Sequence, residues 1–187
     1  MSYTNTGAWT IADKDTPEHC FDFDLVAAIV TILKQHKAKT VVDLGCGLGI
    51  YCQVFKLAGL SPTGYDGNPH THGLTDGRCN VLDLSADIEI GTFDWVISLE
   101  VGEHVPQEYE ETFLNNIAKS AKQGIILSWA VPGQEGLGHV NNHTNEYIIE
   151  KVEALGFTYV EKASKSLRRK AELSWFKNTL LVFLRNK

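Results

Sequence analysis

Carboxylate, imidazole and glycine residues gather at three places in this chain of 187 residues. In residues 43–49, Asp43 precedes three glycines with the spacing G-x-G-x-G, and a second acidic residue, Asp66, follows. Residues 100–104 carry the spacing E-x-x-E-H. A glycine-rich turn lets a ligand approach the backbone closely. Because carboxylates and imidazoles transfer protons or hold divalent cations, these residues indicate a ligand site with polar chemistry.

The glycine-rich turn requires a strand before it and a helix after it. Residues 40–44 form a β-branched run that ends at Gly45, which predicts a buried strand, and a helix is expected from there to about Ala58. The dinucleotide fingerprint is G-x-G-x-x-G, but Ile50 stands at its third glycine. Asp43 would repel a pyrophosphate and attract an ammonium or sulfonium group. The turn therefore favours a positively charged nucleoside, and a plain strand-to-helix turn is the alternative.

Strand-like and helix-like segments alternate along the rest of the chain. Predicted strands cover residues 40–44, 62–65, 80–82, 93–99, 125–129, 157–160 and 179–184. Predicted helices start at Thr16-Pro17, after Gly49, at Pro106 and at Thr144, and residues 67–77 hold at most a short one. Residues 161–178 show little helical signal, which suits an antiparallel last strand. This order predicts a doubly wound, mostly parallel α/β sheet with helices on both faces, and ligands bind beyond the carboxyl ends of such strands.

The glycine-rich turn, the two acids and the element order resemble the class I S-adenosylmethionine-dependent methyltransferases. The matching stretches are residues 41–51, 64–68, 80–84 and 93–105. The resemblance implies a Rossmann-like sheet of seven strands with a reversed last strand. It also implies S-adenosylmethionine as cofactor and S-adenosylhomocysteine as product. The helices around the third strand look shortened, which predicts an open adenine pocket.

The resemblance also implies a role for each residue of these stretches. Gly45, Gly47 and their turn would hold the methionine part of the cofactor, with Asp43 near its amino group. Asp66 would bind the ribose hydroxyls. Asp83 and Leu84 would meet the adenine, and capping is the alternative for Asp83. The further residues expected to contact the cofactor are Cys46, Tyr51, Gly67, Asn68, Leu99 and Glu100.

The acceptor is expected beyond the strands that end near Leu99 and Trp129. Glu100, His104 and His139 are the predicted catalytic residues, and His143 shares the polar loop of residues 132–145. The segment of residues 100–104 is also similar to the metal-binding segment of ubiquinone-pathway O-methyltransferases and small-RNA 2′-O-methyltransferases. That likeness makes a cation site the alternative, with Glu100, Glu103, His104 and either His139 or His143 as ligands. The expectation here is no metal, because many class I enzymes carry a similar segment without one.

Two further segments have alternative interpretations. Residues 1–37 are expected to form a lid over the cofactor or an ordinary packing helix. The aromatic and imidazole side chains of that segment are Trp9, His19, Phe21 and Phe23. The basic run Lys165, Arg168, Arg169 and Lys170 is either a solvated face or a site for a carboxylate, a phosphate or an RNA backbone. Trp175 and Phe176 follow it and are candidates to border the acceptor site.

Composition bounds the class of protein. Hydrophobic residues make up 43% and charged residues 21%, which is ordinary for a globular domain, here one domain over residues 1–187 with its core in residues 38–187. The net charge of −6 opposes general nucleic-acid binding. No apolar run reaches the roughly 20 residues of a membrane span, and no signal-peptide pattern is present. The four scattered cysteines are expected to be thiols in a cytoplasmic protein.

The resulting functional prediction is a methyltransferase that acts on an O, N or S atom of a small molecule. One alternative is an RNA 2′-O-methyltransferase, which the E-x-x-E-H segment and the basic run suggest. Another is a non-catalytic module that binds S-adenosylmethionine. A nicotinamide dehydrogenase is disfavoured because Ile50 replaces the third glycine.

Overall fold

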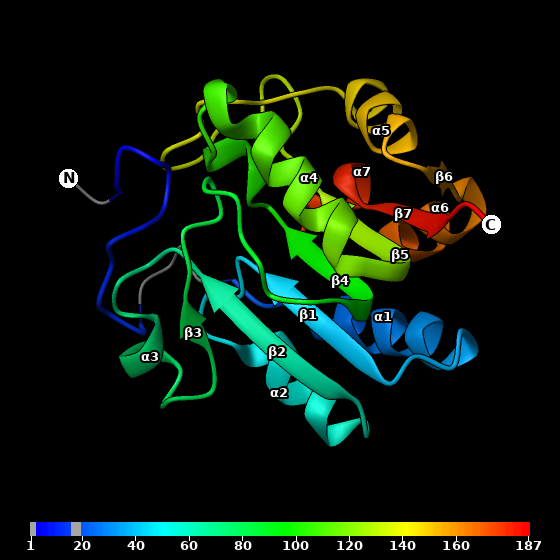
Figure 1. The fold of residues 1–187 in the computed structure, drawn as a ribbon, viewed down its shortest axis with the longest axis horizontal. Helices are drawn as coiled ribbons and strands as arrows, with labels where there is room; N and C mark the ends of the chain where they lie inside the picture. The colour runs from blue at the N-terminus through cyan, green and yellow to red at the C-terminus, as the bar shows by residue number, and fades with distance from the viewer. Residues whose placement is uncertain (1–2, 16–19) are drawn as a thin grey trace.

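Residues 3–15 and 20–187 are described by the computed structural model, which places seven strands in one sheet (Figure 1). The strands are β1 (Thr40–Leu44), β2 (Ser61–Asp66), β3 (Asn80–Val81), β4 (Phe93–Leu99), β5 (Ala121–Ser128), β6 (Phe157–Tyr159) and β7 (Leu181–Arg185). Their order across the sheet is β3-β2-β1-β4-β5-β7-β6. The order reverses direction between β1 and β4, which is where ligands of open α/β sheets bind.

The last strand runs against the others. β1 pairs in parallel with both β2 and β4, and β4 pairs in parallel with β5. β7 pairs antiparallel with β5 on one side and with β6 on the other. The predicted mostly parallel sheet with a reversed last strand is confirmed.

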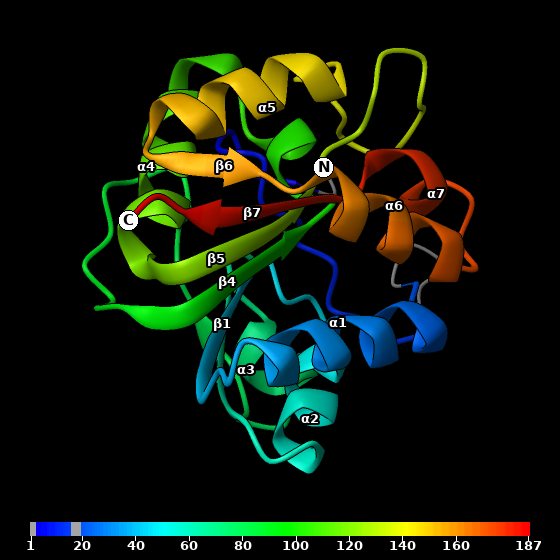
Figure 2. The same cartoon turned by 90° about the vertical axis from the view of Figure 1, so that its right-hand side faces the viewer.

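Helices cover both faces of the sheet (Figure 2). One face carries α1 (Phe23–Gln35), α2 (Ile50–Leu57), α6 (Glu161–Lys170) and α7 (Phe176–Thr179). The other face carries α4 (Glu110–Ser120) and α5 (Asn145–Ala154), while the short α3 (Thr71–Leu74) lies beside β3. Two 3-10 turns, Gly102–His104 and Gln107–Tyr109, stand where the sequence predicted the start of a helix at Pro106.

Alternation along the central strands fills the two layers of the core. In β1, Val41 packs toward α1 and α2, and Val42 packs toward α4 and α5. In β4, Trp95 and Ile97 join the first cluster and Val96 joins the second. This period of two is the geometry of a strand that is buried on both faces. Asp43 and Ser98 lie in these same strands and are buried although they are polar.

One predicted segment differs from the structure, and the predicted start of another lies outside the described residues. Residues 161–178 contain α6 and α7, so the expectation of little helix there was wrong. α6 buries only Ser164 and Leu167, which is too narrow an apolar stripe for a periodicity argument. The first helix begins at Phe23, where the Asp22 carboxylate accepts the Leu25 N–H at 2.8 Å. The helix start predicted at Thr16-Pro17 lies outside the described residues.

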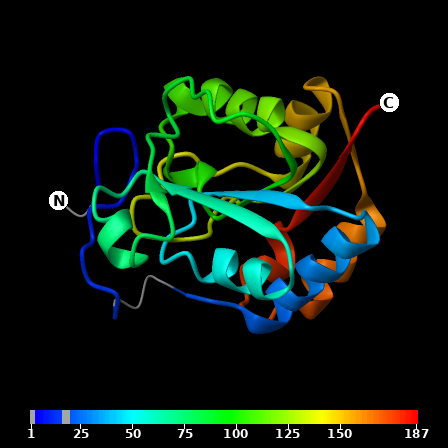
Figure 3. The ribbon, with the colours of Figure 1, turned by 60° about the horizontal axis from the view of Figure 1, so that its bottom comes forward.

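Residues 3–15 run along the carboxyl ends of the parallel strands (Figure 3). The side-chain amide of Asn68 donates to the carbonyl of Ile11 at 2.8 Å, which ties the segment to the turn after β2. A Cβ on Gly7 would lie 1.9 Å from the carbonyl oxygen of His104, so the segment also packs closely on the chain after β4. Within the described residues, no helix combines the length and apolar character needed to cross a bilayer.

Candidate functional site

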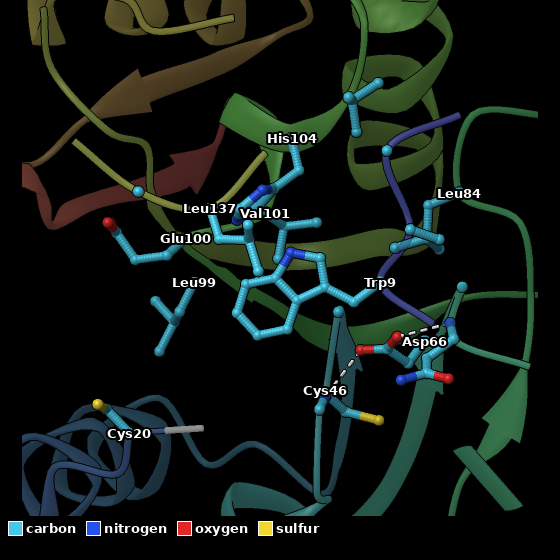
Figure 4. Close-up of a pocket in the computed structure, with 18 of the residues that line it drawn as sticks. Trp9, Cys20, Cys46, Asp66, Leu84, Leu99, Glu100, Val101, His104 and Leu137 are labelled. Atoms are coloured by element: carbon cyan, nitrogen blue, oxygen red, sulfur yellow. Dashed lines mark hydrogen bonds between the residues drawn. The ribbon is translucent and has the colours of Figure 1, made fainter. Parts of the chain in front are cut away.

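A cavity of about 410 Å³ lies at the carboxyl edge of the sheet (Figure 4). The turns after β1, β2, β3, β4 and β5 all contribute to its wall, together with residues 6–9. Every residue predicted to contact the cofactor lines it: Asp43, Gly45, Cys46, Gly47, Tyr51, Asp66, Gly67, Asn68, Asp83, Leu84, Leu99 and Glu100. The predicted catalytic residues Glu100, His104 and His139 line it as well. The fold therefore gathers side chains that lie far apart in the sequence into one site.

Glycine is required in the turn after β1. Gly45 has a φ of +86°, a conformation that residues with a side chain rarely adopt. A Cβ at this position would also lie 2.2 Å from Cγ2 of Val101. The N–H groups of Gly45 and Cys46 both donate to the carbonyl of Tyr65, at 2.8 and 3.0 Å. These two hydrogen bonds fix the turn to the end of β2.

Asp66 joins the turn after β1 to the turn after β2. Its Oδ2 accepts the N–H of Gly47 at 2.8 Å, and its Oδ1 accepts the N–H of Asn68 at 2.8 Å (Figure 4). Each carboxylate oxygen offers a second lone pair. The side chain can therefore shape the turn and still accept hydrogen bonds from a ligand in the cavity.

Asp43 is a carboxyl group in an apolar strand, with 4% of its surface exposed. Burial, with the nearby Cys79 and Asp66, raises its pKa to about 8, while a hydrogen bond from the Cys52 thiol opposes the rise. No positively charged side chain is among the groups that shift the pKa of Asp43. A positively charged ligand group in the cavity would stabilise the ionised form.

The wall around β3 is formed by turns. The Asp83 carboxylate accepts hydrogen bonds from the backbone N–H and the hydroxyl of Ser85, at 3.0 and 2.7 Å. Residues 82–92 contain no helix, so Asp83 caps a turn and not a helix. Leu84 and Ser85 line the cavity beside it. The predicted shortening of the helices around the third strand is present in the structure.

Glu100 has a strained backbone and a well-held carboxylate. Its φ of +53° is unusual for a residue with a side chain, and such strain clusters at functional sites. The Glu100 N–H donates to the Ser128 hydroxyl at 2.8 Å. Gln134 Nε2 donates to its Oε2 at 2.5 Å, and the Thr179 hydroxyl donates to its Oε1 at 3.1 Å. Two donors therefore hold this carboxylate in place.

His104 and His139 meet across the cavity wall. Their ring centroids are 4.9 Å apart in an edge-to-face arrangement. Burial lowers the pKa of His104 to about 4, and the neighbouring His139 contributes to this shift. The His104 imidazole is therefore neutral at physiological pH.

Glu103 lies behind the two imidazoles and is fully buried. Burial raises its pKa well above the ordinary value, and the negative charge of Glu100 adds to the effect. Within residues 3–15 and 20–187, neither of its carboxylate oxygens makes a hydrogen bond of full geometry, although backbone hydrogen bonding at Glu103 and Ala130 opposes the rise in its pKa. Ligand atoms of Glu103, His104 and His139 all lie within 4.8 Å of one another. Glu100 is not in this group, unlike the four-ligand alternative that the sequence left open.

His143 lies outside the cavity. Its Nε2 is 2.7 Å from Oε2 of Glu110, and its ring stacks on Tyr147 with centroids 4.0 Å apart. Asn141 and Tyr147 also donate to the Glu110 carboxylate, at 2.9 and 2.7 Å. These hydrogen bonds hold the loop after β5 against α4 and α5. Of the two candidate histidines, His139 is therefore the one that faces His104.

The N-terminal segment contributes Trp9 to the cavity. Figure 4 shows the indole between the part lined by Asp66 and the part lined by Leu99 and Glu100. Its centroid is 5.4 Å from that of His104, edge to face. Of the other aromatic residues predicted to form a lid, Phe21 lines the cavity and Phe23 is 70% exposed at the start of α1. His19 lies outside the described residues.

The basic run does not reach the cavity. Lys165 pairs with Glu161 one helical turn earlier, and Arg168 Nε donates to the carbonyl of Leu180 at 2.9 Å. Trp175 and Phe176, which follow the run, do line the cavity. The aromatic residues of this loop therefore border the cavity, and its cations do not.

The sequence comparisons decide the family. A profile described as a methyltransferase domain matches residues 17–162. The chain belongs to this family. The resemblance read from the glycine-rich turn and its acidic partners is thereby confirmed.

One curated relative of this methyltransferase domain is a ubiquinone biosynthesis O-methyltransferase from Idiomarina loihiensis. It is 32% identical over 97 residues. The match spans 46% of this chain and only 39% of the relative.

Solved methyltransferases share the fold. The magnesium protoporphyrin IX methyltransferase of Synechocystis PCC 6803, crystallised with bound SAH, superposes with a TM-score of 0.67 and is 21% identical. That superposition covers 86% of this chain and 82% of the other. A sugar N-methyltransferase from a Streptoalloteichus species superposes with a TM-score of 0.70 at 12% identity, over 88% of both chains. At these identities the likeness concerns the architecture.

Sequence reasoning missed several residues that shape the site of this methyltransferase domain. Gln134 and Thr179 position Glu100, and Leu137 lines the cavity. Asp22 is fully buried, and its Oδ2 accepts the N–H groups of Glu172 and Leu173 at 2.7 and 2.9 Å. The polar, glycine-rich loop after β5 was the available signal for Gln134. Asp22 could be read as the cap of the helix that starts at Phe23, but its contacts with Glu172 and Leu173 could not be foreseen, because these partners are about 150 residues away.

Proposed function

We propose that this methyltransferase domain transfers the methyl group of S-adenosylmethionine to an O, N or S atom of a small molecule. The observation that carries the proposal is the placement of Asp43, the turn of Gly45 to Gly47, and Asp66 around one cavity at the point where the strand order reverses. Asp43 is a buried acid with a raised pKa, and no positively charged side chain is among the groups that shift this pKa. Such an acid suits a ligand that carries positive charge.

Each part of the cavity wall has a proposed binding role. Gly45 and Gly47 admit the methionine part, and Asp43 attracts its ammonium group. The Asp66 carboxylate accepts the ribose hydroxyls. Leu84 packs against the adenine beside the turn that Asp83 caps. The same assignment includes Cys46, Tyr51, Gly67, Asn68 and Leu99 as contact residues.

The acceptor side is assigned to Glu100, His104 and His139. When bound, S-adenosylmethionine supplies an electrophilic methyl group on a sulfonium sulfur, so the protein has to align an acceptor with it. Glu100 is held by Gln134 and Thr179, and it orients an O–H or N–H group of the acceptor. The neutral His104 ring, with His139 beside it, is available to accept a proton from that group. A cavity of about 410 Å³ that also takes the cofactor suits a small acceptor.

Residues 3–15 are proposed to act as a lid within one domain that spans residues 1–187. Support comes from the packing of Gly7 on His104, the tie between Asn68 and Ile11, and the position of Trp9 in the cavity. A cover of this kind excludes water from the reacting groups.

Calorimetry and a methylation screen together test the proposed function. Titration with S-adenosylhomocysteine should give one site per chain. A screen of small phenols, amines, thiols and carboxylic acids with labelled S-adenosylmethionine should then give turnover on at least one class. Binding without turnover on any acceptor supports a non-catalytic module instead, and absence of binding contradicts the proposal altogether. An RNA acceptor would show RNA affinity that falls steeply with salt; the exposed pairing of Lys165 and the net charge of −6 do not favour it.

A second candidate feature of the site is a divalent cation bound by Glu103, His104 and His139. The two carboxylate oxygens of Glu103 are buried and make no hydrogen bond of full geometry among the described residues, and the three side chains present their ligand atoms within 4.8 Å. Carboxylate and imidazole ligands suit Mn²⁺ or Zn²⁺, and a cation there would act as a Lewis acid near the acceptor. Equilibrium dialysis with Mn²⁺ tests this: stoichiometric binding that Glu103→Gln abolishes supports the site. No binding at millimolar Mn²⁺ leaves Glu103 as a buried neutral acid.

A further inference from the structure

Three cysteines form a separate buried cluster beneath the glycine-rich turn. Cys46 comes from the turn after β1, Cys52 from α2, and Cys79 from the chain just before β3. Their sulfur atoms lie 3.1, 2.9 and 2.5 Å, respectively, from the point that a Cβ on Gly64 would occupy. Because Gly64 has no side chain, the three sulfurs converge on the space above β2. The proposed methyl transfer uses none of these thiols as a reacting group.

Access to the cluster runs through the cavity. Cys46 lines the cavity and is 7% exposed, whereas Cys79 is fully buried behind it. Cys52 is 5% exposed and does not line the cavity. Of the three clustered thiols, a molecule as small as hydrogen peroxide therefore meets Cys46 first, and it does so only while the cavity is empty.

The protons of the cluster are unevenly shared. A hydrogen bond from Cys46 is the main cause that holds the pKa of the Cys79 thiol below its ordinary value, and the same hydrogen bond raises the pKa of Cys46. This hydrogen bond favours the thiolate form at Cys79 and the thiol form at Cys46. A thiolate is the nucleophile in disulfide formation, so Cys79 is suited to attack an oxidised Cys46.

We propose that Cys46 and Cys79 form an oxidation site for hydroperoxides, which closes to a disulfide when the cavity is empty. The Cys46 thiol passes its proton to the Cys79 sulfur, and the resulting Cys46 thiolate attacks one oxygen of hydrogen peroxide. The O–O bond breaks, and the departing hydroxide takes that proton and leaves as water. The Cys79 thiolate then attacks the sulfur of the Cys46 sulfenic acid. The S–O bond breaks, and the second hydroxide leaves and is protonated by solvent. The two sulfurs lose two electrons in total, and the peroxide is reduced to two water molecules.

The disulfide would change the site because Cys46 stands between Gly45 and Gly47. The backbone N–H groups of Gly45 and Cys46 are held by the carbonyl of Tyr65, and that of Gly47 is held by Asp66. A bond from Cys46 to Cys79 draws the middle of this turn toward the chain before β3. The oxidised protein should therefore bind S-adenosylhomocysteine at least tenfold more weakly, and a bound cofactor should shield Cys46. This consequence rests on the proposed function, whereas the disulfide itself does not.

Peptide mapping by mass spectrometry tests the thiol pair. The full chain is treated with hydrogen peroxide, its remaining thiols are alkylated after denaturation, and a digest without reductant is analysed. A linkage between Cys46 and Cys79 is expected in the wild-type protein. It should persist in Cys20→Ser and be lost in both Cys79→Ser and Cys46→Ala, each checked for folding by circular dichroism. If the wild-type protein keeps Cys46 and Cys79 alkylatable, or if Cys46 pairs with Cys52 instead, the proposal is wrong.

A second arm separates this proposal from the proposed function. Saturating S-adenosylhomocysteine should slow formation of the linkage at least tenfold. Equal rates with the ligand shown to be bound would overturn shielding by the cofactor. If calorimetry detects no binding of S-adenosylhomocysteine to the untreated protein, the proposed function fails, while the linkage in the ligand-free protein still decides the thiol pair.

Discussion

The Asp66 carboxylate accepts the backbone N–H of Gly47 at 2.8 Å, so an acid at the end of one strand fixes the glycine-rich turn at the end of its neighbour. β1 and β2 pair in parallel and bring these two ends to the same edge of the sheet. The binding site is thus built by strand register, and a short side-chain contact completes it.

Replacing Asp66 tests this contact and the ribose role together. Asp66→Ala should weaken S-adenosylhomocysteine binding by about 1–3 kcal/mol, the range for losing hydrogen bonds to a charged group. Asp66→Asn keeps one oxygen for Gly47 and should weaken binding less. Calorimetric titration of both variants measures the difference. Unchanged affinity in Asp66→Ala would contradict the ribose role.

Cofactor affinity should rise with pH up to about 8. The pKa of Asp43 is raised to about 8 in the free protein, so its carboxyl group is neutral at lower pH. The ammonium group of the cofactor favours the ionised form, and binding must then release a proton. Below pH 8 the affinity should fall by up to about tenfold per pH unit. Titrations between pH 6 and 9 measure this slope, and Asp43→Asn should abolish it.

The same shift makes a separate prediction for stability without ligand. Between the ordinary carboxyl pKa of 3.8 and about 8, native Asp43 keeps a proton that the unfolded chain has lost. The native state therefore binds more protons in this window, and the contribution of Asp43 to the free energy of unfolding falls as pH rises. Urea denaturation at several pH values should show a steeper fall for the wild type than for Asp43→Asn. Parallel profiles would place the Asp43 pKa near its ordinary value.

Residues on the acceptor side should affect turnover more than cofactor affinity. Glu100→Gln removes the charge but keeps the shape of the side chain, and His139→Ala removes the imidazole next to His104. Both variants should lower kcat while the dissociation constant of S-adenosylhomocysteine changes little. Activity assays and calorimetry on the same preparations separate the two effects. Full activity in both variants would show that the acceptor binds elsewhere.

Gly45 and Gly59 form a matched pair for the glycine-rich turn. Both have a φ of +86°, but a Cβ on Gly45 would lie 2.2 Å from Val101, whereas a Cβ on Gly59 would meet nothing within 4 Å. Gly59→Ala should cost about 1–2 kcal/mol of stability from backbone strain alone. Gly45→Ala should cost more and should also abolish cofactor binding. Equal losses of stability for the two variants in urea denaturation would mean that the Val101 side chain can move aside without a loss of stability.

Trp9 should report cofactor binding by fluorescence. Its indole lies in the cavity, whereas Trp95 is fully buried in the core. Binding of S-adenosylhomocysteine should change the tryptophan emission, and Trp9→Phe should remove most of that change. Trp95→Phe should keep it. Because Trp175 also lines the cavity, Trp175→Phe is the second control, and a change that survives in Trp9→Phe but is lost in Trp175→Phe would place the ligand away from the N-terminal segment.

Local signals in the sequence were sufficient for the central strands and the turn between them. β1 is a β-branched run that a glycine ends, and five of the seven residues of β4 are apolar, so both strands could be located closely. Asp43, Gly45, Gly47 and Asp66 follow from those strands because the chain itself carries their spacing. α6 was missed because it buries only Ser164 and Leu167 and gives little periodic signal.

Contacts between distant segments were beyond sequence reasoning. Gln134 and Thr179 reach Glu100 from two other parts of the chain, and no spacing rule connects them. Glu110 attracts His143 away from the cavity, which decides between two histidines that the sequence leaves equivalent. The convergence of Cys46, Cys52 and Cys79 on Gly64 likewise depends on how α2 and the chain before β3 pack over β2.

A crystal structure of the protein with S-adenosylhomocysteine tests the central claim most directly. The account predicts the amino acid part of the ligand against Gly45 and Gly47, its ammonium group near Asp43, and its ribose hydroxyls on Asp66. A ligand bound outside this cavity, or a cavity that stays empty at saturating ligand, would contradict it.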